Sequence, residues 1–431
     1  MALPQPGMND ASSYQINHLT LVSSVGRAID ISGIWKEISL YEDIFSNTLS
    51  GSILLNDSRN LINDVPIVGS EYLLISFEKP TQSLRFEKTF RVYKLSDRRH
   101  ETGTNETYIL HFASEELLLN EQILVSKAYQ STPISSMVTD ICKNVLKISS
   151  TKLSQGSIEA TDQTMSVIIP NWSPFYTLNW LAARAVSDSA LSASFVFFEN
   201  RDGFQFRSIE SMLRGEPVLT IHASPRNLGR TRSQNTQNKQ LEGVLQWEMP
   251  HGWDELQTIS LGAYAGSLTI VDVNSQSFDT ITQQSDEQFL STYHSNAFTP
   301  LQQLQNRFGK TPQDMTQSLF RVMPHSADIQ RWMLQRNMSL ARLHGHRIKV
   351  GLPGNLVLTA GALVNCELPT ATGHTDEEKR LDETYSGVYL ITSVHHKIDR
   401  QKHVCSCELI KDSRSSVLSA ADPGVAALGV L

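Results

Sequence analysis

Residues that can bind a metal ion lie close together near the end of the chain. Three histidines and two cysteines fall within thirteen positions, namely His395, His396, His403, Cys405 and Cys407. If they lie on paired strands, Cys405 and Cys407 share one face, whereas His395 and His396 point to opposite faces. Only one of these two histidines then lies beside the cysteines, and the spacing is unlike CxxC or HxxxH sites. We therefore expect core-facing cysteines with histidines at the rim, and no metal ligands.

Other polar clusters carry weaker chemical signals. His344 and His346 flank a glycine and could offer a metal ion two ligands from one side, but the sequence supplies no third ligand beside them. The run HTDEE at residues 374–378 has the composition of a solvated loop. One local basic run contains Arg226, Arg230, Arg232 and Lys239. That run either meets an acidic partner or phosphate, or is a solvated loop, which we favour.

Known catalytic motifs do not occur in the sequence. GxSxG, HExxH, a P-loop and a GxGxxG on a strand–helix junction are missing. A carboxylate pair of the lysozyme type leaves no fixed sequence trace, so a cell-wall hydrolase remains a distant alternative. We expect no catalytic residues, no cofactor and no enzymatic activity.

Composition places the chain among multidomain proteins. Its 431 residues correspond to about three domains. The net charge of −7 gives no basic footprint for sequence-specific nucleic-acid binding. Four cysteines are too few for a disulfide framework, which favours assembly in a reducing compartment. The first residues lack the pattern of a secretory signal, and no apolar run is long enough for a membrane span.

The pattern of elements predicts a mainly β chain with α+β parts. After an arm at residues 1–13, alternating apolar residues predict a tube-like antiparallel β-barrel at 14–113. Within it, LYEDIF at 40–45 is expected to be a loop or helical turn. Residues 114–215 predict an α+β domain, with helices beginning near Thr132-Pro133 and at Ser173-Pro174. Asp202-Gly203 predicts a hairpin turn between two aromatic strands.

A second tube-like barrel is predicted at 216–249 and 326–412. It is interrupted by an inserted domain at 250–325, where residues 302–304 suggest a helix, and is followed by a C-terminal tail at 413–431. A better helix is expected from Ser326. The most informative stretch of this second barrel is 347–369. Alternating apolar residues there predict strands at 348–352, 356–358 and 363–366. Pro353-Gly354 and Gly361 supply turns between them.

The order of these motifs resembles that of baseplate central hub proteins of contractile-tailed bacteriophages. The first matching segment is residues 32–77, where a strand, an acidic-aromatic segment and a second strand precede the turn Pro66–Glu71. The hairpin FVFFENRDGFQFRSI at 195–209 also matches. So do PGNLVLTAGALVNCELP at 353–369 and SGVYLITSVHHKIDRQKHVCSCELIKDS at 386–413. The resemblance covers about residues 14–412, and its specificity lies in the order and spacing of the motifs.

This resemblance implies a structural protein of the virion tail baseplate, assembled in the host cytoplasm. It implies a homotrimer whose six barrels join a three-fold spike to a six-fold tail tube around a channel for DNA. The implied partners are the spike, the tube or tube-initiator protein, the tape measure protein and the baseplate wedge proteins. The alternative is a hub component of a secretion or extracellular contractile injection system. Spike-fused versions carry a repetitive β-helix that this sequence does not show, so we expect a separate spike protein.

Overall fold

The computed structural model describes residues 12–64, 67–80, 82, 84–101, 103, 105–162, 164–189, 192–222, 243–251, 254–273, 276–284, 292–297, 316–322, 329–368, 381–382 and 384–415. The predicted basic run at 226–239, the polar run at 374–378 and the helix suggested at 302–304 lie outside these residues. Most of the predicted arm and tail also lies outside them.

The prediction of a mainly β chain is confirmed, and its largest feature is a sheet with 13 strands in the described residues. The strands are β1 Gln15–Val22, β2 Ala28–Asp30, β3 Trp35–Asp43, β4 Ser50–Asp57, β5 Tyr72–Glu78, β6 Arg85–His100, β7 Glu106–Ala113, β12 Leu219–His222, β13 Gln246–His251, β17 His346–Pro353, β18 Leu363–Glu367, β19 Gly387–Asp399 and β20 His403–Lys411. They run in the order β13-β17-β20-β19-β3-β4-β7-β6-β5-β1-β2, and β12 joins through β18, which pairs with β19.

The first half of the sheet, which we call the N-lobe, consists of β1–β7 with the short helix α1 Leu61–Asp64. Alternate residues of its strands point into a single core, as in β4, where every second residue is buried. The segment between β2 and β3 first continues the β1–β2 hairpin, where the Ile31 amide donates to the Leu19 carbonyl at 3.0 Å.

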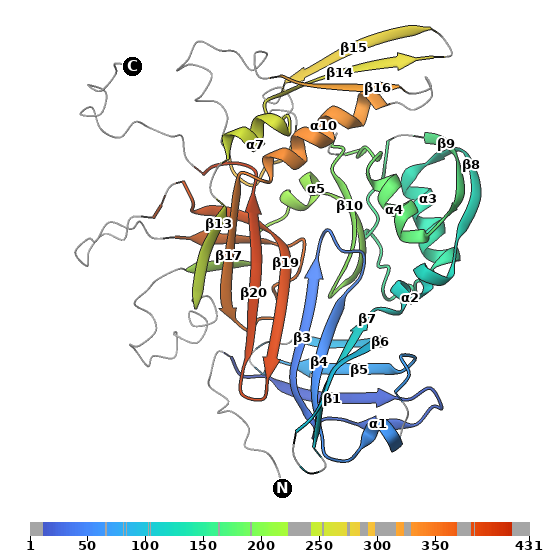
Figure 1. Ribbon diagram of the computed structural model, residues 1–431. Helices are drawn as coiled ribbons and strands as arrows, with labels where there is room; N and C mark the ends of the chain where they lie inside the picture. The colour runs from blue at the N-terminus through green and yellow to red at the C-terminus, as the bar shows by residue number, and fades with distance from the viewer. Residues whose placement is uncertain are drawn as a thin grey trace, which may run out of the picture.

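The second half of the sheet, which we call the C-lobe, consists of β12, β13 and β17–β20. Its core is separate from that of the N-lobe and includes Ile348, Val350, Leu352, Cys405 and Cys407. The edge strands approach each other through a bridge between His222 and Gly243. Each lobe therefore wraps its own apolar core, and Figure 1 shows the C-lobe above and beside the N-lobe.

The middle region, residues 115–213, packs helices and two strand pairs against the N-lobe. Its elements are α2 Glu115–Gln122, β8 Val125–Pro133, α3 Ile134–Asp140, the π-helical turn η1 Ile141–Val145, β9 Thr164–Trp172, α4 Pro174–Ala182, β10 Phe195–Asn200, β11 Gly203–Ser208 and α5 Ile209–Leu213. The predicted helix starts and the Asp202-Gly203 hairpin are confirmed. Gly203 has φ +123°, and a Cβ there would collide with the Lys152 carbonyl, so glycine is required.

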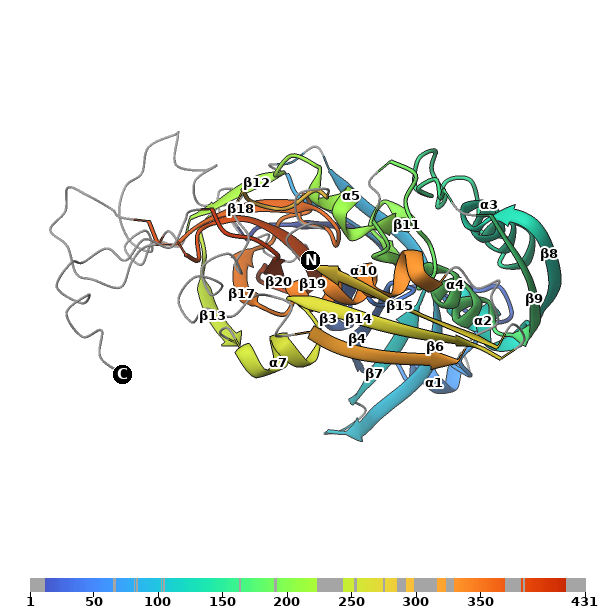
Figure 2. The same cartoon turned by 90° about the horizontal axis from the view of Figure 1, so that it is seen from above.

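A smaller sheet lies at the far end of the molecule. It contains β14 Ala265–Asp272, β15 Ser277–Gln284 and β16 Thr316–Val322, with α7 Glu255–Ser260 nearby. The helix expected from Ser326 is α10 Ile329–Arg342, which packs along β14 (Figures 1 and 2). Its buried side includes Trp332, Leu334 and Met338, because the helix has neighbours on two sides.

Two local predictions are wrong. Residues 40–43 of the LYEDIF segment do not form a loop; they continue β3, which pairs with β4 on one edge and β19 on the other. Glu42 is tolerated in the buried face of this strand because its carboxyl group accepts hydrogen bonds inside the protein. Residues 356–358 do not form a strand either. The chain between β17 and β18 is irregular and buried. Its backbone groups are hydrogen-bonded to side chains from other parts of the fold, which makes this burial possible.

Candidate functional site at the junction of the lobes

The two lobes meet by direct strand pairing. Residues Ser393–Asp399 of β19 run antiparallel to Glu37–Asp43 of β3, with Ser393 opposite Asp43 and Asp399 opposite Glu37. Figure 1 shows these two strands side by side, although they are more than three hundred residues apart in the sequence. Backbone hydrogen bonding therefore makes one sheet of the two lobes and fixes their relative position. We call this contact the seam.

The outer face of the seam is polar. The ring of His395 stacks on Tyr41 at a centroid distance of 4.5 Å, and its Nε2 lies 3.1 Å from the Ser39 hydroxyl. The Lys397 amine pairs with the Glu37 carboxylate at 3.1 Å. Burial lowers the pKa of His395 and the positive charge of Lys397 adds to this, so the imidazole is neutral near pH 7.

The same outer face carries charges of both signs on the neighbouring strand of the C-lobe. The Arg347 guanidinium pairs with the Glu408 carboxylate at 2.9 Å. In the register of β20 and β19, Glu408 lies opposite Ser393. Ser393 in turn lies opposite Asp43 of β3. The face that crosses the seam therefore alternates acidic, basic and neutral polar groups and is not uniformly basic.

The inner side of the seam holds the irregular segment between β17 and β18. We call residues 354–362 the junction loop. Glu42, on the inner face of β3, accepts hydrogen bonds from the Thr359 hydroxyl at 2.7 Å and the Ala360 amide at 3.0 Å. Burial raises the pKa of this carboxyl despite the two hydrogen bonds. Both bonds join the N-lobe to the C-lobe.

The N-lobe also holds the start of the junction loop. The Lys79 amine donates to the Gly354 carbonyl, and the Gln82 side chain donates to Asn355 Oδ1 at 2.7 Å. Gln82 accepts in turn from the Leu356 amide at 3.2 Å. The Leu356 side chain is 1% exposed and packs in the core of the N-lobe, although its backbone belongs to the C-lobe. The loop thus inserts one apolar side chain across the junction.

The middle region contacts the same loop from a third direction. Asn200 donates through its side-chain amide to the Ala360 carbonyl at 3.0 Å, and the Arg201 guanidinium donates to the Leu356 carbonyl. Glu199, one residue earlier, accepts from the Leu49 amide at 3.0 Å and pairs with Lys88 at 3.5 Å. The β10–β11 turn therefore joins both lobes, and side chains from three parts of the fold converge on residues 354–362.

The histidines and cysteines singled out in the sequence divide between the two faces of the sheet. His395 faces outward, whereas His396 and Cys405 meet on the inner face. His403 joins them there, and these three residues are buried. The expectation of histidines at the rim is therefore wrong for His396 and His403, which are buried. The signal for His403 was the two-residue period of His403, Cys405 and Cys407 on one strand.

The other histidine pair is not part of this cluster. His346 is buried at the start of β17, with its ring edge-on to Tyr385 at 5.9 Å. Burial lowers the pKa of His346 to about 3, and the charges of Lys411 and Arg414 act in the same direction. His344 precedes the strand and is exposed.

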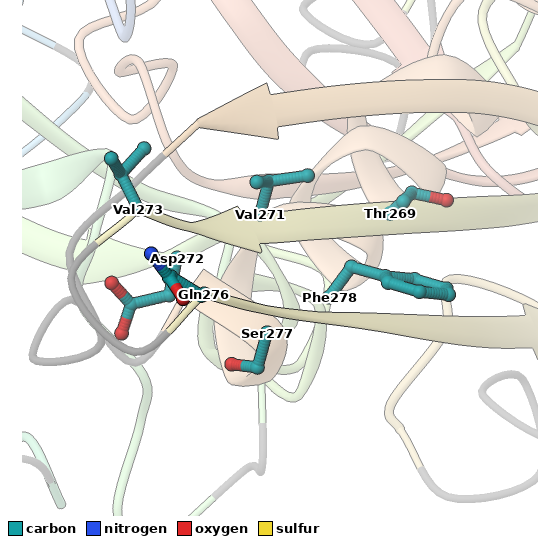
Figure 3. A pocket seen from close by; sticks show the side chains of 7 residues that line it. All are labelled: Thr269, Val271, Asp272, Val273, Gln276, Ser277 and Phe278. Carbon is teal, nitrogen blue, oxygen red and sulfur yellow. The ribbon is translucent and has the colours of Figure 1, made fainter.

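A shallow hollow lies at the tip of the β14–β15 hairpin (Figure 3). It is lined by Thr269, Val271, Asp272, Val273, Gln276, Ser277 and Phe278. The Phe278 side chain is 78% exposed. The hollow is open and mostly apolar, so it lacks the enclosed shape that small-molecule sites have.

Comparisons with known proteins place this geometry in context. No family model matches the chain. The chain is 22% identical over 430 residues to the probable baseplate hub protein gp334 of Vibrio phage KVP40, covering 95% of this chain and 96% of that protein. Among the described residues, no helix is long and apolar enough to cross a membrane.

Solved tail proteins share the fold at low sequence identity. The tail protein from Neisseria meningitidis MC58 aligns with a TM-score of 0.54 and 10% identity, over 93% of this chain and 97% of that one. The tail protein of prophage MuSo2 from Shewanella oneidensis aligns with a TM-score of 0.55 and 11% identity, over 94% of this chain and 100% of that one. These likenesses show that the chain shares the fold of the two tail proteins. The resemblance to baseplate hub proteins that the sequence motifs indicate agrees with the similarity to the Vibrio phage protein.

Proposed function

We propose that this chain is a structural baseplate hub of a contractile phage tail, without enzymatic activity. The curated relative is named a probable baseplate hub protein, and the likeness extends over nearly both full lengths. The observation that carries the proposal is the seam, where β3 and β19 join two core-bearing lobes in one sheet. An adaptor that transmits load through a tail needs such a fixed relation between its lobes.

The proposed assembly is a homotrimer. Three chains with two lobes each present six sheet units around one axis, which matches a three-fold spike on one side and a six-fold tube on the other. The barrel divisions at 14–113 and at 216–249 with 326–412 belong to this proposal. So do the α+β domain at 114–215, the insertion at 250–325, the arm at 1–13 and the tail at 413–431.

The polar outer face of the seam supports a channel for DNA. Its charges alternate in sign, as in the pairs Arg347–Glu408 and Lys397–Glu37. A lining of this kind makes few strong phosphate contacts, so DNA passes without being retained. The proposed partners are the spike, the tube or tube initiator, the tape measure protein and the wedge proteins, in a virion baseplate assembled in the host cytoplasm.

Light scattering after size-exclusion chromatography tests the assembly. The purified full chain, alone and with its spike and tube partners, should elute with the mass of three chains or a complex built on three. A chain that stays monomeric with both partners present contradicts the proposal. Clearing of peptidoglycan in a zymogram would contradict the non-enzymatic part separately.

A further inference from the structure

Three metal-ligating side chains meet on the inner face of the C-lobe. His396 lies on β19, and His403 and Cys405 lie on β20, with His396 opposite Cys405 in the register. Nδ1 of His396 is 3.1 Å from Nε2 of His403 and 3.1 Å from Sγ of Cys405, and Sγ is 3.6 Å from Nε2. The three residues are at most 3% exposed. Three ligand atoms thus form a compact triangle in the interior.

The size of this triangle is that of a zinc coordination face. With Zn–N near 2.05 Å and Zn–S near 2.3 Å, tetrahedral geometry separates neighbouring nitrogens by about 3.3 Å and nitrogen from sulfur by about 3.6 Å. The observed nitrogen–nitrogen separation of 3.1 Å and the His403–Cys405 separation of 3.6 Å are close to these values. The His396–Cys405 separation of 3.1 Å is about half an ångström shorter than the tetrahedral value, so these two side chains must move apart slightly to share one ion.

Hydrogen bonding alone leaves this cluster incompletely satisfied. A ring nitrogen carries either one proton or one lone pair, so Nδ1 of His396 makes a well-directed hydrogen bond to one neighbour only. It nevertheless lies 3.1 Å from both the His403 nitrogen and the Cys405 sulfur. An ion at the centre of the triangle accepts electron pairs from all three atoms at once.

The backbone of Asn355 lies beside the cysteine sulfur. The Asn355 amide donates to Sγ of Cys405 at 3.3 Å, as second-shell donors to metal-bound thiolates do. The Asn355 carbonyl oxygen lies 3.8 Å from the same sulfur.

The cluster is also built against the junction loop. Gly354 packs against the His403 ring so closely that a Cβ atom there would collide with it. Phe77 of the N-lobe meets the same ring edge-on at 5.7 Å. A bound ion would therefore fasten β19, β20 and the junction loop at the point where the lobes meet.

We propose that His396, His403 and Cys405 form a structural binding site for a zinc-type transition metal ion. Binding replaces the thiol proton of Cys405, which passes to solvent, by a sulfur–metal bond, and the two imidazoles donate their ring-nitrogen lone pairs. No electron transfer is involved. This inference changes the expectation drawn from the sequence, which placed the histidines, His403 included, at the rim and expected no metal ligands.

Metal content and a cobalt spectrum test the site in the full chain. Protein is produced in medium supplemented with Zn²⁺ and, separately, refolded with Co²⁺. We expect roughly one metal ion per chain by elemental analysis, and a thiolate-to-cobalt charge-transfer band in the Co²⁺ form. Cys405→Ala should lose both signals. The control Cys407→Ala removes the next cysteine on the same face and should keep both.

Folding of each variant is checked by circular dichroism. If Cys405→Ala does not fold, the cobalt spectrum of the wild-type chain decides alone, because the charge-transfer band itself requires a thiolate ligand. Folded wild-type protein without stoichiometric metal and without that band overturns the site. Equal metal content in folded Cys405→Ala and wild type overturns it as well.

Discussion

Buried polar residues carry the junction between the lobes. Glu42 lies in a strand and is 2% exposed, yet both of its interactions cross from β3 to the junction loop. A buried carboxyl is tolerated only when it is hydrogen-bonded, and removing it leaves its donors without partners. The junction therefore combines hydrogen-bonded buried polar groups with apolar burial.

Replacing Glu42 with alanine should destabilise the chain strongly. The Thr359 hydroxyl and the Ala360 amide would lose their acceptor inside the protein, which costs about 3 kcal/mol. Glu37→Ala is the matched control on the same strand; its surface pair with Lys397 contributes within about 1 kcal/mol. Urea unfolding measures both free energies of unfolding, and equal values for the two variants would contradict this role of Glu42.

A second buried carboxyl makes stability depend on pH. Asp412 is 4% exposed and lies 2.5 Å from Nδ1 of His294, with the Ser295 amide donating at 3.1 Å. Burial alone would raise the pKa of Asp412, but the hydrogen bond and charge of His294 outweigh it and lower the pKa to about 2. The folded state therefore favours the carboxylate.

The stability supplied by Asp412 should disappear in acid. A carboxyl whose pKa is lower in the folded state stabilises the fold above its unfolded pKa of about 4, and that contribution is lost as pH falls toward 2. Asp412→Asn should cost about 2 kcal/mol at pH 6, and the difference from wild type should narrow between pH 4 and pH 2. Chemical denaturation across this range measures it. A difference that is constant with pH would show that the carboxylate charge plays no part.

At the scale of elements, the apolar pattern of the junction loop predicts a strand, whereas the folded chain is irregular there. Its Leu356 side chain lies in the core of the N-lobe and its Leu358 side chain in that of the C-lobe. Two apolar residues at a spacing of two normally indicate one strand with a single buried face. Here they serve two cores on opposite sides, and the backbone between them is irregular.

Leu356→Asp should prevent folding or assembly. The substitution places an unpaired charge in the core of the N-lobe, at a cost of 4 kcal/mol or more, on the order of the chain's whole stability. Val357→Asp is the control, because the next side chain is only half-buried and can turn toward solvent. Soluble yield and thermal unfolding compare the two. Normal yield and melting of Leu356→Asp would show that the loop does not fasten the lobes.

Elements with strong local signals could be predicted from the sequence, whereas contacts between distant segments could not. Pro174 marks the start of α4, and Asp202-Gly203 marks a hairpin, because these residues favour the required backbone locally. By contrast, residues 40–43 looked like a turn because Glu42 and Asp43 are acidic. Their strand conformation depends on pairing with β19, which no local pattern reveals. The position of His403 beside His396 likewise depends on the β19–β20 register.

At the scale of the whole molecule, two lobes are held in one sheet. The seam leaves both lobes with fixed orientation, so a ring of three chains would show six units of similar size. Each lobe has its own core, although the side chains of Leu356 and Ile398 from the C-lobe lie in the core of the N-lobe. Chain symmetry and lobe duplication together would convert three-fold into six-fold symmetry.

Electron microscopy of the purified particle viewed along its axis tests this claim most directly. Class averages should show a three-fold ring with six density lobes around an open centre, the alternate lobes differing slightly because the N-lobe and C-lobe are not identical. Averages that show single chains, or a ring without three-fold symmetry, would contradict the account.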